Sequence, residues 1–151
     1  MLYQLDQYLS NSLTKVFEPA IGQRVKYTPN TGSGLISTAN TNLNGTGTIV
    51  NILVSTDLSV SSGTFIETVT IQAIGNTTRG MVRLFVGDGE LILELIAEVD
   101  IPSVTVSSVD KAFSITLQTD FMLQSNHVLS ASTEKAESFI VIAEGFDTAW
   151  P

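Results

Sequence analysis

The sequence contains no cysteine, a single histidine and a small share of charged residues. Without cysteine there are neither disulfide bonds nor thiolate metal ligands, so stability must come from packing or from association with other chains. His127 could support catalysis only in an arrangement of the Ser-His-Asp type, and no Gly-x-Ser-x-Gly motif accompanies the neighbouring Ser125 and Asp120. We therefore expect His127 to be a loop residue and the protein not to be an enzyme.

Motifs for metal ions, cofactors and phosphate groups are also missing from the sequence. The acidic pair Glu94 and Glu98 could bind Ca²⁺ or hydrolyse a glycoside, and so could Glu134 and Glu137. Both pairs have basic residues as predicted partners or neighbours, so we interpret them as solvated ion pairs. The glycine-containing stretch 40–48 lacks the lysine of a phosphate-binding loop. We expect no metal ion and no cofactor.

Charged residues make up 15% of the chain, and their distribution is uneven. Residues 1–34 carry a net charge of +1, whereas residues 35–151 carry 13 acidic and 4 basic side chains. An acidic body repels phosphate backbones, which argues against direct binding of nucleic acid. The N-terminus lacks the pattern of a signal peptide, and no window of about 18 apolar residues could cross a membrane. We expect neither nucleic acid nor a membrane as a partner.

Threonine and serine are abundant, with 18 and 16 residues, and they supply an uncharged polar surface. Threonine suits strands because its β-branch packs on a pleated surface while its hydroxyl faces water. Short apolar runs recur between turn residues from Leu35 onward, a spacing typical of a sandwich or barrel. We expect an all-β, antiparallel, eight-stranded β-sandwich, jelly-roll-like, over residues 35–151. The predicted strands are Leu35–Ala39, Thr48–Val54, Phe65–Ile74, Met81–Val86, Leu91–Ile101, Ala112–Gln118, Val128–Thr133 and Ser138–Glu144.

Residues 1–34 are expected to form a short helix and an extended arm. Apolar residues recur there at spacings of three and four, which places them on one stripe of a helix. The stripe consists of Leu2, Leu5, Leu9, Leu13, Val16 and Phe17. Pro19 ends this helix, and further breakers keep the next stretch irregular, namely Gly22, Pro29, Gly32 and Gly34. The stripe packs either on the body of its own chain or on a neighbouring subunit, and both alternatives stay open.

The dipeptide Asp88-Gly89 predicts a hairpin with a two-residue type I′ turn, because both central residues of that turn need a positive φ. On the core face, this register pairs Val86 with Leu91, Leu84 with Leu93, and Val82 with Leu95. On the outer face, it pairs Arg83 with Glu94, Arg79 with Glu98, Phe85 with Ile92, and Met81 with Ile96. A helix over Glu90–Asp100 is the competing interpretation, and the matched charges favour the strand.

Several large apolar residues are candidates for binding another protein. The outer face of the hairpin mixes large apolar residues with ion pairs, a pattern typical of a subunit interface. These apolar residues are Met81, Phe85, Ile92 and Ile96. Coverage of this face by the N-terminal helix is an equally open alternative. Trp150 lies near the chain end and either folds back on the core or anchors a neighbour. The predicted partner-binding set comprises these five residues together with Leu2, Leu5, Leu9, Leu13 and Phe17.

Three segments of the body carry a family resemblance, namely Ala39–Val50 (ANTNLNGTGTIV), Thr78–Phe85 (TRGMVRLF) and Ala131–Phe139 (ASTEKAESF). Together they resemble a family of small β-sandwich proteins of tailed bacteriophages, which are virion structural proteins of the capsid auxiliary or decoration type. The resemblance extends from about Thr38 to Gly145 and does not include residues 1–34. It implies a place on the phage particle and contributes no catalytic motif.

We therefore expect a non-catalytic structural protein of a bacteriophage virion, assembled in the cytoplasm of the bacterial host. The preferred role is an auxiliary or decoration protein that binds other virion proteins, chiefly the major capsid protein, as a homo-oligomer, with a trimer favoured. The alternative is a head-fibre, tail or baseplate component with a host- or glycan-binding role, which exposed aromatic clusters would favour. A small hydrolase would require His127 in a cleft beside an acid and a nucleophile.

Overall fold

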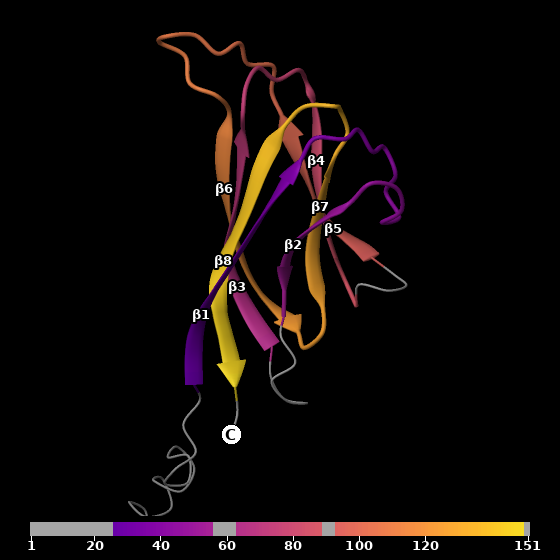
Figure 1. The fold of residues 1–151 in the computed structure, drawn as a ribbon, viewed down its shortest axis with the longest axis vertical. Helices are drawn as coiled ribbons and strands as arrows, with labels where there is room; N and C mark the ends of the chain where they lie inside the picture. Colours follow the sequence, from indigo (N-terminus) through magenta and orange to yellow (C-terminus); the bar gives the residue numbers. More distant parts are fainter. Residues whose placement is uncertain (1–25, 56–62, 89–92, 150–151) are drawn as a thin grey trace, which may run out of the picture.

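The structure, a computed structural model, describes residues 26–55, 63–88 and 93–149, and these form strands and loops without a helix. They form two four-stranded sheets (Figure 1): the first sheet has the order β1-β8-β3-β6 and the second sheet β2-β7-β4-β5. The strands are β1 (Lys26–Ile36), β2 (Val50–Val54), β3 (Gly63–Ala73), β4 (Gly80–Gly87), β5 (Leu93–Ile101), β6 (Ser114–Gln124), β7 (Val128–Thr133) and β8 (Phe139–Ala149). The expected all-β, antiparallel, eight-stranded architecture in two sheets is confirmed.

The predicted N-terminal helix falls within residues 1–25, which lie outside the described residues. Among the residues that are described, no helix is long and apolar enough to cross a membrane.

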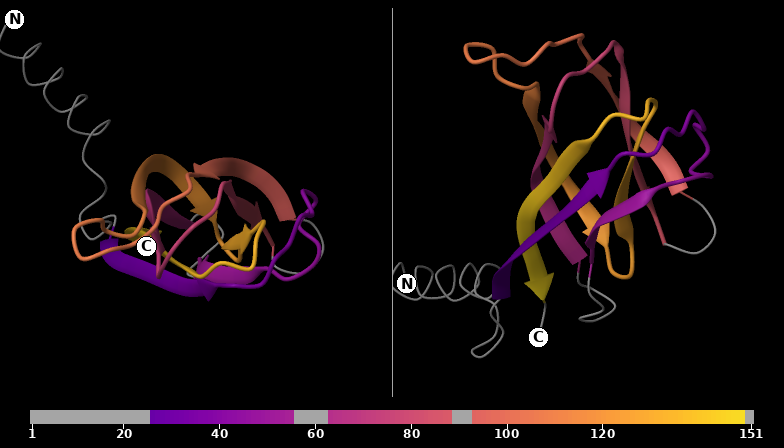
Figure 2. Two further views of the ribbon diagram at one scale, coloured as in Figure 1. Left: turned by 90° about the horizontal axis from the view of Figure 1, so that it is seen from above. Right: turned by 45° about the horizontal axis from the view of Figure 1, so that its top comes forward.

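The order of the strands follows from one nested pattern of antiparallel pairs. β1 pairs with β8, β2 with β7, β3 with β6 and β4 with β5, so the chain runs as a long hairpin ribbon folded over itself. Pairing of β3 with β8 and of β4 with β7 joins these pairs into the two sheets. Strands β1, β3, β5 and β7 therefore all end at the same end of the sandwich, and the loops after β3, β5 and β7 gather there, at the top of Figure 1 and of the right panel of Figure 2; we call it the loop end. β1 begins and β8 ends at the opposite end.

The core lies between the two sheets and is built from alternate residues of their strands, as the two-residue period of a strand requires. The first sheet contributes Ile66, Val69, Ile71, Leu123, Phe139, Val141 and Ala143. The second sheet contributes Ile52, Leu53, Val82, Leu84, Val99, Ile101, Leu129 and Ala131. Aliphatic residues dominate this core, in agreement with the many Val and Ile residues of the sequence.

Strand β1 differs from the prediction, which placed a strand at Leu35–Ala39 and an irregular arm before it. Residues 26–34, assigned to that arm, instead pair with β8. A Cβ on Gly32 would lie 2.1 Å from the Ile52 backbone oxygen, so this glycine allows β1 to cross β2 closely and does not interrupt the strand. Pro29 is tolerated because β1 is an edge strand, where a missing N–H need not break a ladder. Each of the other predicted strands overlaps an observed one.

The hairpin of β4 and β5 forms, but its register is not the one predicted from Asp88-Gly89. Gly87 pairs with Leu93, so five residues separate the paired positions and a two-residue turn is ruled out. Arg83 pairs with Glu98, four residues beyond its predicted partner. Glutamate recurs every four residues in this part of the chain, and an even shift keeps each side chain on the same face of a strand. The charge pattern therefore fits both registers.

A β-bulge at the start of β5 changes which residues face the core. Leu84 pairs with Ala97 and Phe85 with Leu95, which leaves Ile96 as the extra residue. A one-residue bulge exchanges the two faces of the strand beyond it. Leu95 consequently shares the outer face with Phe85, whereas Leu93 and Leu95 had been predicted to face the core.

Candidate interaction surfaces

The three segments that carry the family resemblance meet at one corner of the second sheet. The backbone N–H of Asn40 donates to the Thr133 oxygen at 2.8 Å, and the N–H of Glu134 donates to the Met81 oxygen at 2.9 Å. The N–H of Thr78 donates to Glu137 Oε1 at 2.9 Å. Segments that are far apart in the sequence therefore form one structural unit.

Arg83 is the centre of this corner, because its guanidinium joins two of the segments to β5. The residue is only 7% exposed. Its Nε donates to Glu98 Oε1 at 2.9 Å, and its Nη1 donates to the backbone oxygen of Asn40 at 3.2 Å. A buried cation needs such partners, since an unpaired charge away from water is costly. Arg83 thus holds the loop 37–49 against the outer face of the second sheet.

The side chain of Asn40 gives the same loop its internal shape. Its Nδ2 donates to the backbone oxygens of Thr46 and Thr48, each at 2.9 Å, and its Oδ1 accepts from the N–H of Asn42 at 3.0 Å. Gly47 has φ +85° and a Cβ on it would lie 2.8 Å from Asn40 Oδ1, so glycine is required there. The loop is a rigid, hydrogen-bonded cover.

The loop 37–49 covers part of the hairpin face that was predicted to bind a partner. Phe85 is fully buried, so its side chain does not lie on the surface of the described residues, and its assignment to the partner-binding set stays an untested prediction. The loop approaches the same face at Gly45, where a Cβ would lie 2.5 Å from Leu93 Cβ. Met81 is half-buried, and Ile96, at 45%, is the exposed one among the three described members of the set.

The remaining members of the predicted partner-binding set lie outside the described residues. They are Leu2, Leu5, Leu9, Leu13, Phe17, Ile92 and Trp150.

The loop end exposes aliphatic side chains on a firmly bonded frame. The exposed residues are Ile74, Val106 and Val109, and Val109 at a turn is 88% exposed. Thr77 and Val104 exchange two backbone hydrogen bonds of 2.9 and 3.0 Å, which join the loop after β3 to the loop after β5. Within the second of these loops, Ser107 Oγ accepts the N–H of Asp110 at 3.0 Å. These hydrogen bonds define the backbone of the loop that carries Val106 and Val109.

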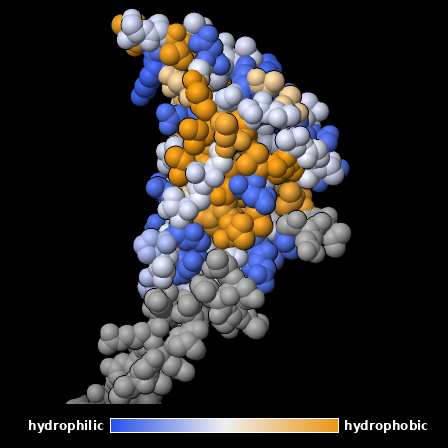
Figure 3. Space-filling view, viewed as in Figure 1, coloured by the Kyte–Doolittle hydropathy of each residue, from blue (hydrophilic) through white to orange (hydrophobic). Residues whose placement is uncertain are grey.

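The outer face of the first sheet carries a row of apolar side chains, which we call the aromatic row. Pairing aligns Pro29, Phe146, Phe65 and Met122 across all four strands. The ring of Tyr27, 64% exposed, meets Phe146 edge-on with centroids 5.3 Å apart, and Phe65 lies 5.3 Å from the same ring. Figure 3 shows that apolar residues also gather along the middle of the face where β1 and β8 run.

Sequence analysis missed the aromatic row, although the sequence contains a signal for this face. The run from Phe139 to Ala143 is continuously apolar, whereas a strand with one solvated face alternates between apolar and polar residues. Its inward residues are core, and its outward residues Ile140 and Ile142 are exposed and half-buried, respectively. The continuous run thus indicated apolar residues on both faces.

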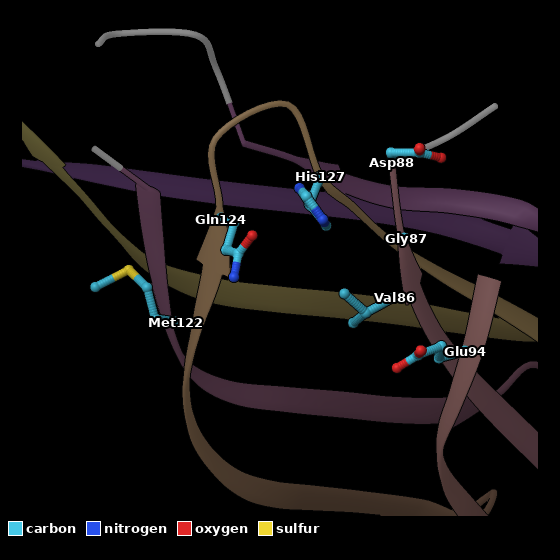
Figure 4. Close-up of a pocket in the computed structure, with 7 residues that line it drawn as sticks. All are labelled: Val86, Gly87, Asp88, Glu94, Met122, Gln124 and His127. Atoms are coloured by element: carbon cyan, nitrogen blue, oxygen red, sulfur yellow. The ribbon is translucent and has the colours of Figure 1, made fainter. Parts of the chain in front are cut away.

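His127 lies in the connection between β6 and β7 at a pocket of about 350 Å³ (Figure 4). The described residues that line the pocket are Val86, Gly87, Asp88, Glu94, Met122, Gln124 and His127. They include acids but neither serine nor threonine, so the described lining offers no hydroxyl nucleophile. His127 Nδ1 lies 3.1 Å from the backbone oxygen of Ser125. Within the described ranges, no group of three or more potential metal ligands is present.

The fold and its surfaces define a small antiparallel β-sandwich with a rigid apolar loop end and an apolar outer sheet face. No family model matches the chain, and no curated protein matches it. Two crystal structures of a pentameric capsid protein isolated from metagenomic phage sequences are similar to it, at 14% identity and a TM-score of 0.37. The similarity covers 78% of this chain and 59% or 61% of those chains, so the chain spans less than two thirds of their length. A likeness this low defines neither family nor function.

Proposed function

We propose that the chain is a non-catalytic structural protein of a bacteriophage virion, and specifically an auxiliary or decoration protein that stabilises the capsid. The observation that carries the proposal is the loop end, where exposed aliphatic side chains sit on hydrogen-bonded loops. Such a surface binds without a large loss of conformational entropy, because it is ordered beforehand. The nested strand pairing supports classification as a jelly roll, a fold common among viral capsid domains. The resemblance of three body segments to phage virion proteins supports the same role.

Such a protein would stabilise the capsid by adding contact area between capsid subunits. The chief partner is the major capsid protein, and each copy would bury its apolar tips across a junction between capsomers. Binding to the assembled shell, and not to free subunits, stabilises the shell by mass action. A small homo-oligomer, with a trimer favoured, would multiply this contact area without new residues. The protein would act in the virion, after assembly in the host cytoplasm.

The test is the number of copies per particle, measured by quantitative staining of purified virions against the major capsid protein. A decoration protein follows the symmetry of the shell and is expected at a copy number on the order of hundreds. A copy number of about a dozen or fewer, typical of a cyclic tail or fibre assembly, would overturn the decoration role.

A head-fibre, tail or baseplate component with a glycan-binding role is a second candidate, and the aromatic row favours it. Tyr27 presents an exposed ring beside Phe146, and the amphipathic ring of tyrosine suits a partner that is both apolar and polar. Under this alternative, a glycan array would give signals that Tyr27→Ala abolishes. Absence of any glycan signal for the wild-type chain would remove the alternative.

A further inference from the structure

The outer face of the first sheet exposes more apolar area than a solvated sheet face requires. Along β8, the outward positions are Ile140, Ile142, Glu144, Phe146 and Thr148, since Phe139, Val141 and Ala143 face the core. Three of these five outward residues are large and apolar. Leu35 lies beside Ile140, and Tyr27 beside Phe146, which extends the apolar surface onto β1. A contiguous patch of this kind marks a contact site on a soluble protein.

We propose that residues 2–17 of the same chain dock on this face, with their apolar stripe along β8. As the helix that its sequence predicts, the segment advances about 6.0 Å for every four residues. The outward positions of a strand repeat every two residues, or about 6.6 Å. The two axial rises are similar, so Leu5 would lie near Ile140 and Leu9 near Ile142, and the stripe, which turns by about 40° for every four residues, would end with Phe17 near Phe146.

The direction of this match agrees with where the described chain begins. Phe17 would lie over Phe146, at the end of the sandwich where β1 starts with Lys26. Asn30 Nδ2 donates to Asp147 Oδ1 at 2.9 Å, which fixes the first part of β1 to β8 at that end. The eight residues 18–25 span at most about 29 Å, which is ample for a connection between two points at the same end. Pro19 and Gly22 lie in this connection and suit a change of direction.

Docking on the chain's own face is favoured over docking on a second copy by proximity. A segment tethered by eight residues meets its own sheet at an effective concentration in the millimolar range, well above the concentration of a second copy in solution.

Charge also permits this contact. The strands of the first sheet carry several acids but only one basic residue, Lys26. Residues 1–25 carry two basic and two acidic side chains, against a net charge of −8 for the whole chain. The segment is therefore not repelled by the acidic body, as another acidic surface would be.

The absence of cysteine permits a direct test by cross-linking in the full-length chain. The pair Leu9→Cys and Ile142→Cys is treated with a short bismaleimide, and the products are separated by denaturing gel and intact mass. The control pair combines Leu9→Cys with Ile96→Cys, which is exposed on the second sheet. We expect at least about tenfold more internally bridged monomer for the first pair than for the control. Docking would hold the cysteine at position 9 at a high effective concentration near position 142 but not near position 96. The pair Leu5→Cys and Ile140→Cys provides a second measurement if the first variant does not fold.

Two results would overturn the proposal. Equal bridging in the Ile142 and Ile96 variants would show that the segment does not dock on the first sheet. Cross-linked dimers in place of bridged monomers, at protein concentrations in the low micromolar range, would show that the occupant of this face belongs to a second copy. Neither result depends on the role of the chain in the virion, because both are read from the isolated protein.

Discussion

At the scale of single residues, glycine permits two close contacts between backbones in this sandwich. A Cβ on Gly145 would lie 1.9 Å from the Phe65 backbone oxygen, at the bulge of β3, and one on Gly32 would lie 2.1 Å from the Ile52 oxygen. Real Cβ atoms do not approach backbone oxygen so closely, and backbone cannot move aside as a side chain can. These two glycines are therefore required by the packing of strands against one another.

Alanine at either glycine should consequently unfold or strongly destabilise the chain. We expect Gly32→Ala and Gly145→Ala each to lower the free energy of unfolding by more than about 3 kcal/mol in urea denaturation. The matched control is Gly75→Ala, because nothing lies within 4 Å of a Cβ built there. Alanine at Gly75 should be neutral or stabilise by up to about 1 kcal/mol through the unfolded state. Equal effects at Gly75 and Gly32 would contradict the close approach.

Arg83 gives a second prediction at this scale. Arg83→Ala removes a buried cation, leaves the Asn40 oxygen without this donor and opens a cavity, so the free energy of unfolding should fall by about 2–4 kcal/mol. Amide hydrogen exchange in the loop 37–49 should accelerate in parallel, because this loop loses its bond to β4. Arg79→Ala is the control, since Arg79 is exposed and should change stability by less than about 0.5 kcal/mol. A fully stable Arg83→Ala variant with unchanged exchange would contradict the proposed clamp.

At the scale of elements, the register of the β4–β5 hairpin can be measured by a double-mutant cycle. Arg83 and Glu98 are in contact at 2.9 Å, and Glu98 is partly exposed, so their coupling should be about 1 kcal/mol. Arg83 and Glu94 should show no measurable coupling, because Glu94 pairs with Val86 beyond the bulge. A larger coupling to Glu94 would restore the register that the Asp88-Gly89 dipeptide predicts.

The number of strands and their places along the chain could largely be predicted from the sequence, because turn residues separate the apolar runs so regularly, whereas the order of the strands in the two sheets could not. The predictions that failed concern features that depend on which other strands a segment contacts in the folded chain. Gly32 and Pro29 look like strand breakers until the edge position of β1 and its crossing over β2 are known. The hairpin register failed because glutamates four residues apart fit two registers, and no local signal marks a bulge at Ile96.

The candidate surfaces were harder to predict than the fold for a related reason. Phe85 has the sequence context of an exposed interface residue, yet the loop 37–49 is held over its sheet by Arg83. Coverage by a loop depends on tertiary contacts, which periodicity along one strand does not report. The aromatic row combines residues from four strands, and its members become neighbours only through the pairing of those strands.

At the scale of the whole molecule, the two apolar surfaces have different proposed tasks. The outer face of the first sheet is assigned to the chain's own N-terminal segment, and the loop end to another virion protein. If the tasks are separate, substitutions at the loop end should affect attachment to particles without affecting the fold. Exposed side chains at turns contribute little to the stability of the body, so such variants should fold normally.

Val109→Asp and Ile74→Asp should therefore each weaken binding to particles assembled without this chain by about tenfold or more, as expected when a charge replaces an apolar anchor. Binding is measured by co-sedimentation of purified chain with the particles over a range of concentrations. Ile96→Asp is the matched control, because Ile96 is exposed on an edge strand away from the loop end and should leave binding unchanged. If Ile96→Asp abolished binding while both loop-end variants bound normally, the contact with the shell would lie on the β5 edge and not at the loop end.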